Sequence, residues 1–273
     1  MTATERSTAG ALLRRWRQQR RLSQLALSLE ADVSQRHLSC VEAGRAAPSR
    51  AMVLRLADYL RIPLRERNAI LAAAGFSAGF SERALQAPEM RAAREAMERI
   101  VHGHLPHPAL AVDRHWNLIL ANDAVLLLLS GITEALLHPP VNVLRLSLHP
   151  DGLAPRILNF PEWRAHLLAR LAHDADAGAD AVLIDLLAEL TALPVPPVFR
   201  TARPPLPQAP GIAVPLCLRG ANGTLSFLST TTVFGTAMDV TLAEVTIETF
   251  FPADHATAIA MAAGLEASPR ARR

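Results

Sequence analysis

The chain has 273 residues, more than one compact domain usually holds, and half of them are hydrophobic, which is enough for two cores. No signal peptide opens it, and its longest apolar stretch, residues 124–129, is far shorter than the ~20 residues that span a bilayer. We therefore expect a cytoplasmic protein with no membrane partner. Cys40 and Cys217 lack the paired spacing of a disulfide, zinc or redox motif, so neither a metal nor another cofactor is expected.

The charges are distributed unevenly along the chain. All 28 basic residues are arginines; residues 1–75 contain 13 of them against 6 acidic residues, whereas residues 76–273 contain 15 against 19. A charged face that serves only solvation does not predict such an asymmetry. The first part of the chain is therefore predicted to meet a polyanion such as nucleic acid.

Five short helices are predicted in the first 75 residues. Ser7 or Thr8 can cap the first of them, and Ser23, Ser34 and Ser49 precede later ones. The predicted helices cover residues 9–20, 24–30, 35–43, 50–60 and 64–74. Gly75 then supplies a residue suited to a left-handed helix end. Residues 1–78 are predicted to form an all-α domain.

The rest of the chain changes character after a Gly- and Ser-containing joint. Residues 79–103 are predicted to be a linker and a connector helix, from Pro88 to His102, whose apolar stripe packs on the next domain. Strands are predicted at 109–113, 116–121, 212–219, 224–232 and 244–251, and helices at 123–129, 161–173 and 181–192. The prolines of residues 194–210 predict an irregular loop. Residues 104–265 therefore read as an α+β domain with an antiparallel sheet, and 266–273 as a flexible tail.

The sequence LSQLALSLEADVSQRHLSCVEAGRAAPS, residues 22–49, resembles the repressor-type helix-turn-helix of Cro, cI and XRE regulators. The resemblance implies a sequence-specific DNA-binding module in which the second helix of the motif reads base edges from its N-terminal end. Gln35 and Arg36 occupy that end, and their side chains suit adenine and guanine respectively. Gln24 matches the family glutamine that contacts a phosphate. The full set of candidate DNA-contacting residues is Gln24, Ser34, Gln35, Arg36, Ser39, Cys40 and Arg45.

Two positions depart from the pattern of this family. Ser28 replaces a small apolar residue, and Asp32 replaces the glycine of the turn. Serine can bond back to its own helix, and aspartate tolerates the left-handed conformation, so we expect the turn to survive both changes. Arg17 and Glu42 occupy the positions at which similar repressors join their first and third helices by an ion pair.

Residues from about 104 onward resemble the ligand-binding domain of MmyB-like transcription regulators, which has a PAS-like fold. The resemblance rests on NVLRLSLHPDGLAPRILNFPEW, residues 142–163, and on LSFLSTTTVFGTAMDVTLAEVTIETFFPAD, residues 225–254. It implies a homodimeric transcription regulator that binds a double-stranded operator and senses a small, fatty-acid-like molecule. Candidate ligand-binding residues are Trp116, Phe160 and Trp163 as apolar walls and His149 as a polar end.

Catalytic motifs were sought as the main alternative to a sensor. The sequence has no G-x-S-x-G elbow, no Gly-rich phosphate loop and no H-E-x-x-H. We therefore expect no enzymatic activity. A C-terminal domain that acts on a small metabolite, or one that serves only for dimerisation, remains an alternative at this point.

Overall fold

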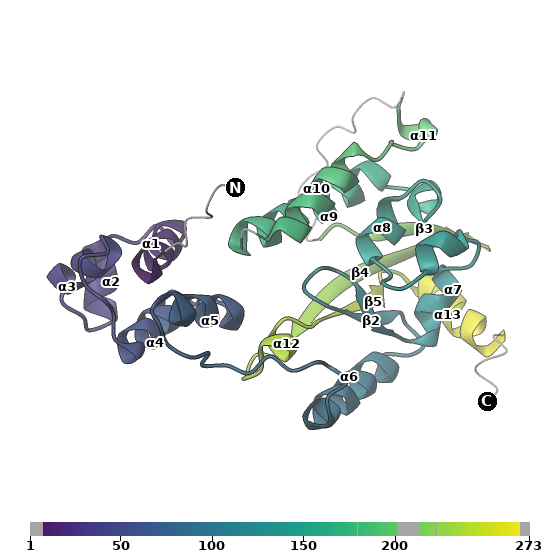
Figure 1. Ribbon diagram of the computed structural model, residues 1–273. Coiled ribbons are helices and arrows are strands. Elements are labelled where there is room, and N and C mark those ends of the chain that lie inside the picture. Colours follow the sequence, from purple (N-terminus) through teal and green to yellow (C-terminus); the bar gives the residue numbers. More distant parts are fainter. Residues whose placement is uncertain (1–7, 179, 201–212, 222, 268–273) are drawn as a thin grey trace. The chain divides into compact units, whose positions relative to one another are not determined.

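The computed structural model describes residues 8–178, 180–200, 213–221 and 223–267 (Figure 1). The chain divides into two compact units. The helical unit consists of residues Met1–Ala84 and Thr236–Ala243, and the sheet unit of residues Leu85–Gly235 and Glu244–Arg273. Among the described residues, no helix combines the length and the apolar character needed to cross a membrane.

The helical unit begins with the five helices that the sequence predicts. They are α1 (Ala9–Gln19), α2 (Gln24–Glu30), α3 (Gln35–Glu42), α4 (Arg50–Tyr59) and α5 (Leu64–Ala73). The side-chain oxygens of Thr8, Ser23, Ser34 and Ser49 accept a hydrogen bond from a backbone N–H in the first turn of α1 to α4. These caps satisfy amides that the helix itself leaves unpaired, so both the helices and their starting points are confirmed.

The core of this unit forms where α1 and α3 cross at short range. Leu13 and Trp16 of α1 and Leu38 and Val41 of α3 are all buried. Gly10 makes the crossing possible, because a Cβ atom at this position would lie 1.9 Å from the carbonyl oxygen of Val41. The helical spacing of the apolar residues therefore selects the buried faces, and the glycine sets how closely the two helices approach.

The turn between α2 and α3 accommodates both departures from the family pattern. Asp32 adopts a left-handed conformation with φ of 47°, and its side chain is exposed. Ser28 is buried, and its hydroxyl donates to the carbonyl oxygen of Leu25 at 2.8 Å. Gly75, after α5, is also left-handed, with φ of 83°. These three predictions are confirmed.

A short segment from the C-terminal half of the chain completes the helical unit. It comprises residues 236–243 and includes α12 (Val240–Ala243), which packs near α5. Asp239 is buried and accepts hydrogen bonds from Ser81 at 3.0 Å and Arg83 at 3.2 Å. The sequence did not predict this grouping, because nothing local distinguishes residues 236–243 from the strands on either side.

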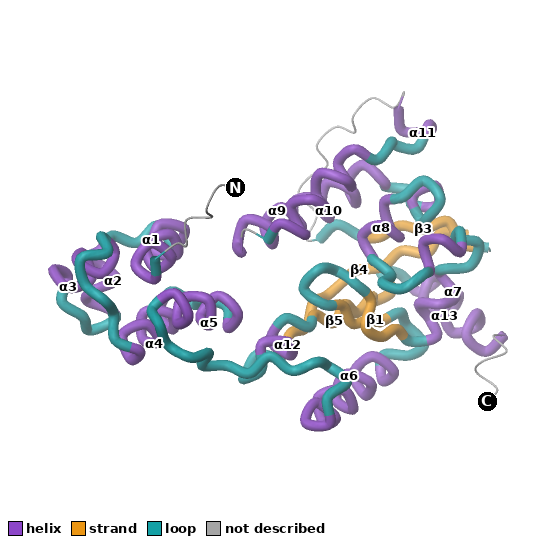
Figure 2. Tube along the Cα trace, viewed as in Figure 1, coloured by secondary structure: helices purple, strands orange, loops and turns teal. Residues whose placement is uncertain are grey.

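The sheet unit contains five antiparallel strands, shown in orange in Figure 2. They are β1 (Ala109–Val112), β2 (Leu118–Ala121), β3 (Leu216–Gly220), β4 (Gly223–Val233) and β5 (Thr246–Pro252). Their order in the sheet is β2-β1-β5-β4-β3. The sheet is therefore built from both ends of the domain sequence, as predicted, and β5 lies at its centre.

One face of the sheet is covered by α6 (Arg91–Gly103), which follows the short 3-10 helix η1 (Pro88–Met90). Met97 and Val101 of α6 share a buried cluster with Ala109, Ala111 and Ile247 of the sheet. The stripe of the predicted connector helix thus packs on the sheet unit, as expected. The alternation of side chains along a strand directs the neighbours of these residues to the opposite face.

The opposite face carries the main core of the sheet unit. Leu110 of β1, Leu218 of β3 and Phe227 of β4 join a cluster that includes Phe160 and Leu171. The helices that contribute to this cluster are α7 (Asp123–Leu128), α8 (Val143–Leu148), α9 (Phe160–Gly178), α10 (Ala181–Ala192) and α13 (His255–Ala267). The short 3-10 helices η2 (Glu134–Leu137) and η3 (Ala154–Arg156) lie between α7 and α9 in the sequence.

The proline-rich stretch corrects one prediction. Residues 194–210 were expected to hold no regular structure, yet α11 (Pro197–Arg200) forms a helical turn within them. Proline has a fixed φ suited to the first position of a helix, so Pro197 can begin the turn that prolines elsewhere would interrupt. Residues 201–210 lie outside the described part of the chain. The helices α8, α12 and α13 were also not predicted.

Candidate functional site

The N-terminal end of α3 presents a polar surface. Gln35, Arg36 and His37 are exposed, whereas Leu38 and Val41 of the same helix are buried. Among the other candidate residues, Ser34 and Arg45 are exposed, and Ser39 and Cys40 are half-buried. The side chains suited to reading bases are therefore accessible at the end of the helix at which such contacts are made.

Glu42, at the end of α3, anchors this helix to α1. The guanidinium of Arg17 donates to Glu42 in a bidentate way, from Nε to Oε1 at 2.7 Å and from Nη2 to Oε2 at 2.8 Å. The side chains of Arg17 and Glu42 are only 11% and 2% exposed. The expected ion pair is thus confirmed and is buried, and it fixes α3 relative to α1.

Gln24 belongs to the same network. Its side-chain nitrogen donates to Glu42 Oε2 at 2.8 Å, although the sequence pattern gave it only a phosphate contact. Burial alone would raise the pKa of Glu42, but hydrogen bonds from Arg17 and Gln24 and the charge of Arg17 outweigh it and leave this pKa below its ordinary value of 4.5. Glu42 therefore favours its charged form.

A cavity with a volume of about 100 Å³ lies within the sheet unit, between one face of the sheet and helices α7, α8 and α9. Apolar side chains form most of its wall. From the sheet and adjacent loops come Pro108, Leu110, Trp116, Leu118, Leu216, Leu218 and Phe250, and from the helices and their connections Val125, Leu128, Leu129, Val143, Leu144, Leu146, Leu153, Trp163 and Leu167. Such a wall favours an apolar ligand.

Two of the four predicted ligand-binding residues line this cavity, namely Trp116 and Trp163. Phe160 is not part of the lining; it is buried and lies near Phe199, with ring centroids 6.1 Å apart. His149 also lies outside the lining, and its Nδ1 accepts a hydrogen bond from the backbone N–H of Asp151 at 3.1 Å. The polar groups that line this cavity are therefore residues other than His149, and a contact of His149 with a ligand stays a prediction.

Arg170 of α9 and Glu248 of β5 form the charged part of the lining. Arg170 Nη2 donates to Glu248 Oε1 at 2.6 Å, and the guanidinium carbon lies 4.5 Å from the centroid of the Trp116 ring. Thr231 of β4 donates to the same Oε1 at 3.1 Å. Glu248 is buried in the middle of the central strand, where an uncompensated carboxylate would be very costly. We call Arg170, Glu248 and Trp116 the polar pole of the cavity.

One feature of the sequence marks this pole, although the predictions above did not include it. Glu248 is the single charged residue in the otherwise apolar and β-branched strand TIETFFP. A charge in a strand that pairs on both sides requires a partner. The partner is Arg170, 78 residues earlier in the chain, which no local pattern identifies.

The remaining polar groups of the lining are Ser147, His166 and Ser229. Ser147 Oγ accepts a hydrogen bond from Trp163 Nε1 at 2.9 Å, which satisfies this buried indole and fixes its orientation in the wall.

Asp174, one turn beyond Arg170 on α9, has a raised pKa. Burial disfavours its charged form more strongly than the charge of Arg170 and a hydrogen bond with Trp116 favour that form. The carboxyl groups of Glu248 and Asp174 therefore both lie near Arg170.

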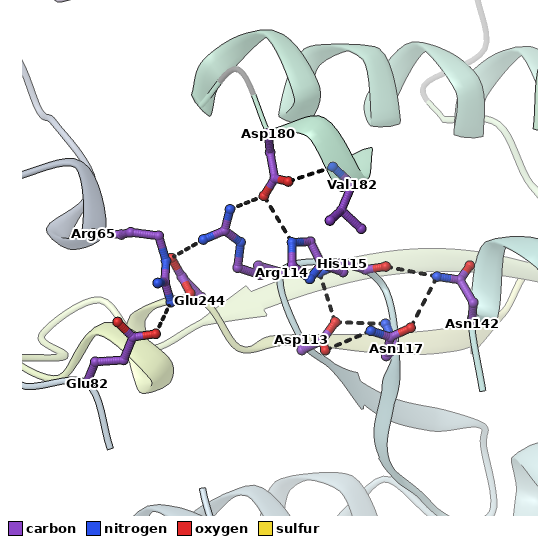
Figure 3. Close-up of polar contacts among 10 residues, drawn as sticks. All are labelled: Arg65, Glu82, Asp113, Arg114, His115, Asn117, Asn142, Asp180, Val182 and Glu244. Carbon is purple, nitrogen blue, oxygen red and sulfur yellow. Dashed lines mark hydrogen bonds and ion pairs between the residues drawn. The ribbon is translucent and has the colours of Figure 1, made fainter. Parts of the chain in front are cut away.

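Trp116 is held in place by the turn between β1 and β2. Its φ of 65° lies in the left-handed region, which is unusual for a bulky side chain and is sustained only by strong surrounding contacts. Asp113 supplies these contacts: it accepts hydrogen bonds from the backbone N–H groups of His115 and Asn117, each at 2.8 Å (Figure 3). The strained backbone is thus fixed where the indole reaches the cavity.

Asp180 ties the same turn to the start of α10. It accepts a hydrogen bond from the Val182 N–H at 3.0 Å, pairs with Arg114, and lies 3.0 Å from His115 Nε2 (Figure 3). Asn142, which caps α8, also donates to the carbonyl oxygen of His115 at 2.8 Å. The starts of α8 and α10 therefore meet at the turn that carries Trp116.

Comparison with known families gives two matches. A model of the helix-turn-helix domain matches residues 8–70, and a model of the MmyB-like transcription regulator ligand binding domain matches residues 93–263, more than half of the chain. No curated protein sequence gives a significant match. The first model covers the polar N-terminal end of α3, and the second covers the cavity of the sheet unit. The chain therefore belongs to the MmyB-like transcription regulators, with a helix-turn-helix DNA-binding domain followed by a ligand-binding domain.

Proposed function

We propose that this regulator recognises a specific operator through α3 and changes its affinity for that operator when a small amphipathic molecule occupies the cavity of the sheet unit. The observation that carries the proposal is the cavity itself, which combines an apolar wall with the polar pole. It lies in the domain that matches the family model of a ligand-binding domain. A cavity of this kind orients a ligand through its few polar groups and gains affinity from its apolar surface.

Operator recognition is assigned to the exposed N-terminal end of α3. Gln35 and Arg36 are exposed and can form bidentate hydrogen bonds with adenine and guanine. Gln24, Ser34 and Arg45 are proposed to contact the DNA phosphate backbone. We further propose a cytoplasmic homodimer, because two copies of α3 about 34 Å apart would read half-sites one helical turn apart. The short base-reading surface of one module makes such a pairing necessary for specificity.

Replacing Arg36 with alanine should weaken operator binding by about 1–3 kcal/mol and relax the preference at one base pair. The reason is that Arg36 is exposed at the reading end of α3, so its loss removes base contacts without disturbing the core. The measurement is a binding-site selection with wild-type and variant protein at one fixed salt concentration.

Arg61→Ala is the matched control for this experiment. Arg61 is exposed and follows α4, so the variant loses the same charge at a position outside α3. It should retain the wild-type preference at every base pair. If Arg36→Ala also retained that preference, α3 would not be the reading helix.

We propose a fatty-acid-like molecule as the ligand, because sixteen apolar side chains line the cavity and its polar groups include the pole. A dry engineered cavity of about 150 Å³ admits benzene, so a cavity of about 100 Å³ suits a short apolar chain. Longer chains would require the surrounding helices to move. Affinity is therefore expected to pass through a maximum as chain length increases.

The chain offers two routes from the cavity to the helical unit. The first is α6, which packs on β1 and β5 and precedes the cavity in the sequence. The second is the segment 236–243, which joins β4 to β5 and belongs to the helical unit. Since Ser229 of β4 and Glu248 of β5 both line the cavity, a ligand that shifts these strands also displaces the ends of that segment.

A saturating ligand should change operator affinity about 5- to 150-fold, and the operator should change ligand affinity by the same factor. The test measures operator binding of the full chain with saturated chains of 6, 8, 12 and 16 carbons, each as the carboxylate and as the primary amide. Leu144→Trp, which fills the cavity, is the control: its operator affinity should stay at the ligand-free level throughout. An unchanged operator affinity in wild-type protein shown to bind one of these molecules would mean that the domain is not a sensor for them, and would favour an enzymatic or a purely dimerising role.

A further inference from the structure

We infer that the polar pole of the cavity accepts an uncharged head group that both donates and accepts hydrogen bonds, such as an amide or a hydroxyl, in preference to an ionised carboxylate or an ammonium group. The inference rests on the proposed function, since it specifies which end of an amphipathic ligand the cavity selects. It follows from the contacts of Arg170 and Glu248 and from the charges around them.

The charges at the pole already compensate one another. Arg170 is bound to Glu248 at 2.6 Å, and Trp116 covers its guanidinium at 4.5 Å. An ionised carboxylate entering here would meet an arginine that is already paired with the Glu248 carboxylate, and an ammonium ion would meet an arginine that is fixed in place. In a poorly solvated site, each of these encounters opposes binding strongly.

The hydrogen-bonding groups at the pole nevertheless leave room for a neutral partner. Both hydrogen bonds that Glu248 receives from described residues end on Oε1, which leaves Oε2 as an acceptor. Arg170 has five N–H donors, and its contact with Glu248 uses one of them, on Nη2. An amide can donate to Oε2 and accept from the guanidinium at the same time, whereas a carboxylate has no donor and an ammonium has no acceptor.

The experiment compares octanamide, octanoate and octylamine near neutral pH by calorimetry on the full chain. The three probes share one apolar chain, so differences in affinity report the head group. Wild-type protein should bind octanamide about tenfold or more tightly than either charged probe. In Glu248→Gln the arginine loses its carboxylate partner, so octanoate should bind about tenfold more tightly than it does to wild type.

Glu189→Gln is the matched control. Glu189 pairs with Arg145 at 2.6 Å in the same unit, but its side chain is 44% exposed and does not line the cavity. This variant should keep the wild-type order of the three probes, and circular dichroism checks that both variants fold. Should Glu248→Gln fail to fold, the wild-type order alone decides.

The possible results separate the two proposals. Octanoate binding wild type as tightly as octanamide, or more tightly, would overturn the head-group inference and leave the proposed sensor intact. A preference for octylamine would do the same. Failure of all three probes to bind would overturn the proposed ligand cavity together with the head-group inference.

Discussion

Replacing Glu42 with alanine is expected to lower the free energy of unfolding of the helical unit by about 3–5 kcal/mol. The glutamate side chain is 2% exposed and accepts two hydrogen bonds from Arg17 and one from Gln24. Its removal leaves the guanidinium of Arg17 buried without its anion, and the cost of an unpaired buried charge exceeds that of a lost contact. The same change frees α3, so operator binding should weaken as well.

Hydrogen exchange of the α1 and α3 amides, followed by mass spectrometry, measures this loss within the full chain, because it reports the opening of each segment separately. Asp58→Ala is the control. Asp58 pairs with Arg67 in the same unit, but its side chain is 66% exposed, so its loss should cost less than about 1 kcal/mol. Equal costs for the two variants would mean that the Arg17–Glu42 pair contributes no more than a surface ion pair.

The pair also predicts how stability depends on pH. The pKa of Glu42 is lower in the folded protein than its ordinary value of 4.5, so the folded state binds a proton less readily than the unfolded state. This contribution is fully present above pH 4.5 and is lost as the pH falls through the folded pKa. The Glu42→Gln variant should lose less stability than wild type as the pH falls, because glutamine does not titrate. Hydrogen exchange of the α1 and α3 amides at decreasing pH measures this difference.

Replacing Arg170 with methionine is expected to destabilise the sheet unit by about 3 kcal/mol. Methionine preserves much of the packing against Trp116, so the loss arises from Glu248, which stays buried in the central strand without its cation. The value falls at the low end of the range for broken buried pairs because the Arg170 side chain is 26% exposed. Hydrogen exchange of the β5 amides measures this loss of stability.

The double variant Arg170→Met with Glu248→Leu provides the decisive comparison. Replacing both charges by apolar side chains of similar size should restore the wild-type stability or exceed it, since neither charge is then desolvated. A double variant as unstable as Arg170→Met would show that the pair itself holds the sheet unit together. Recovery of stability would show instead that the fold does not require the pair, which supports a role in binding.

The sequence by itself determined the elements whose causes are local. Thr8, Ser23, Ser34 and Ser49 begin helices because the side-chain oxygen of each reaches the amide only three residues away. The spacing of Leu38 and Val41 likewise selected the buried face of α3 and left Arg36 exposed. Short apolar and β-branched runs bounded by turn residues indicated all five strands, because such runs favour extended backbone in a sheet whose faces are covered. The two-domain regulator was therefore predictable from short-range patterns and family resemblance.

The tertiary structure alone decided the features that depend on distant partners. Arg170 and Glu248 are 78 residues apart, and only the packing of α9 on the central strand brings their charges together in the cavity. The same packing leaves His149, which the sequence favoured for that role, outside the lining. The segment 236–243 joins the helical unit through Ser81 and Asp239, a pairing that no local pattern encodes. Local propensity acts over a few residues, whereas a cavity is defined by whichever side chains the completed fold turns toward it.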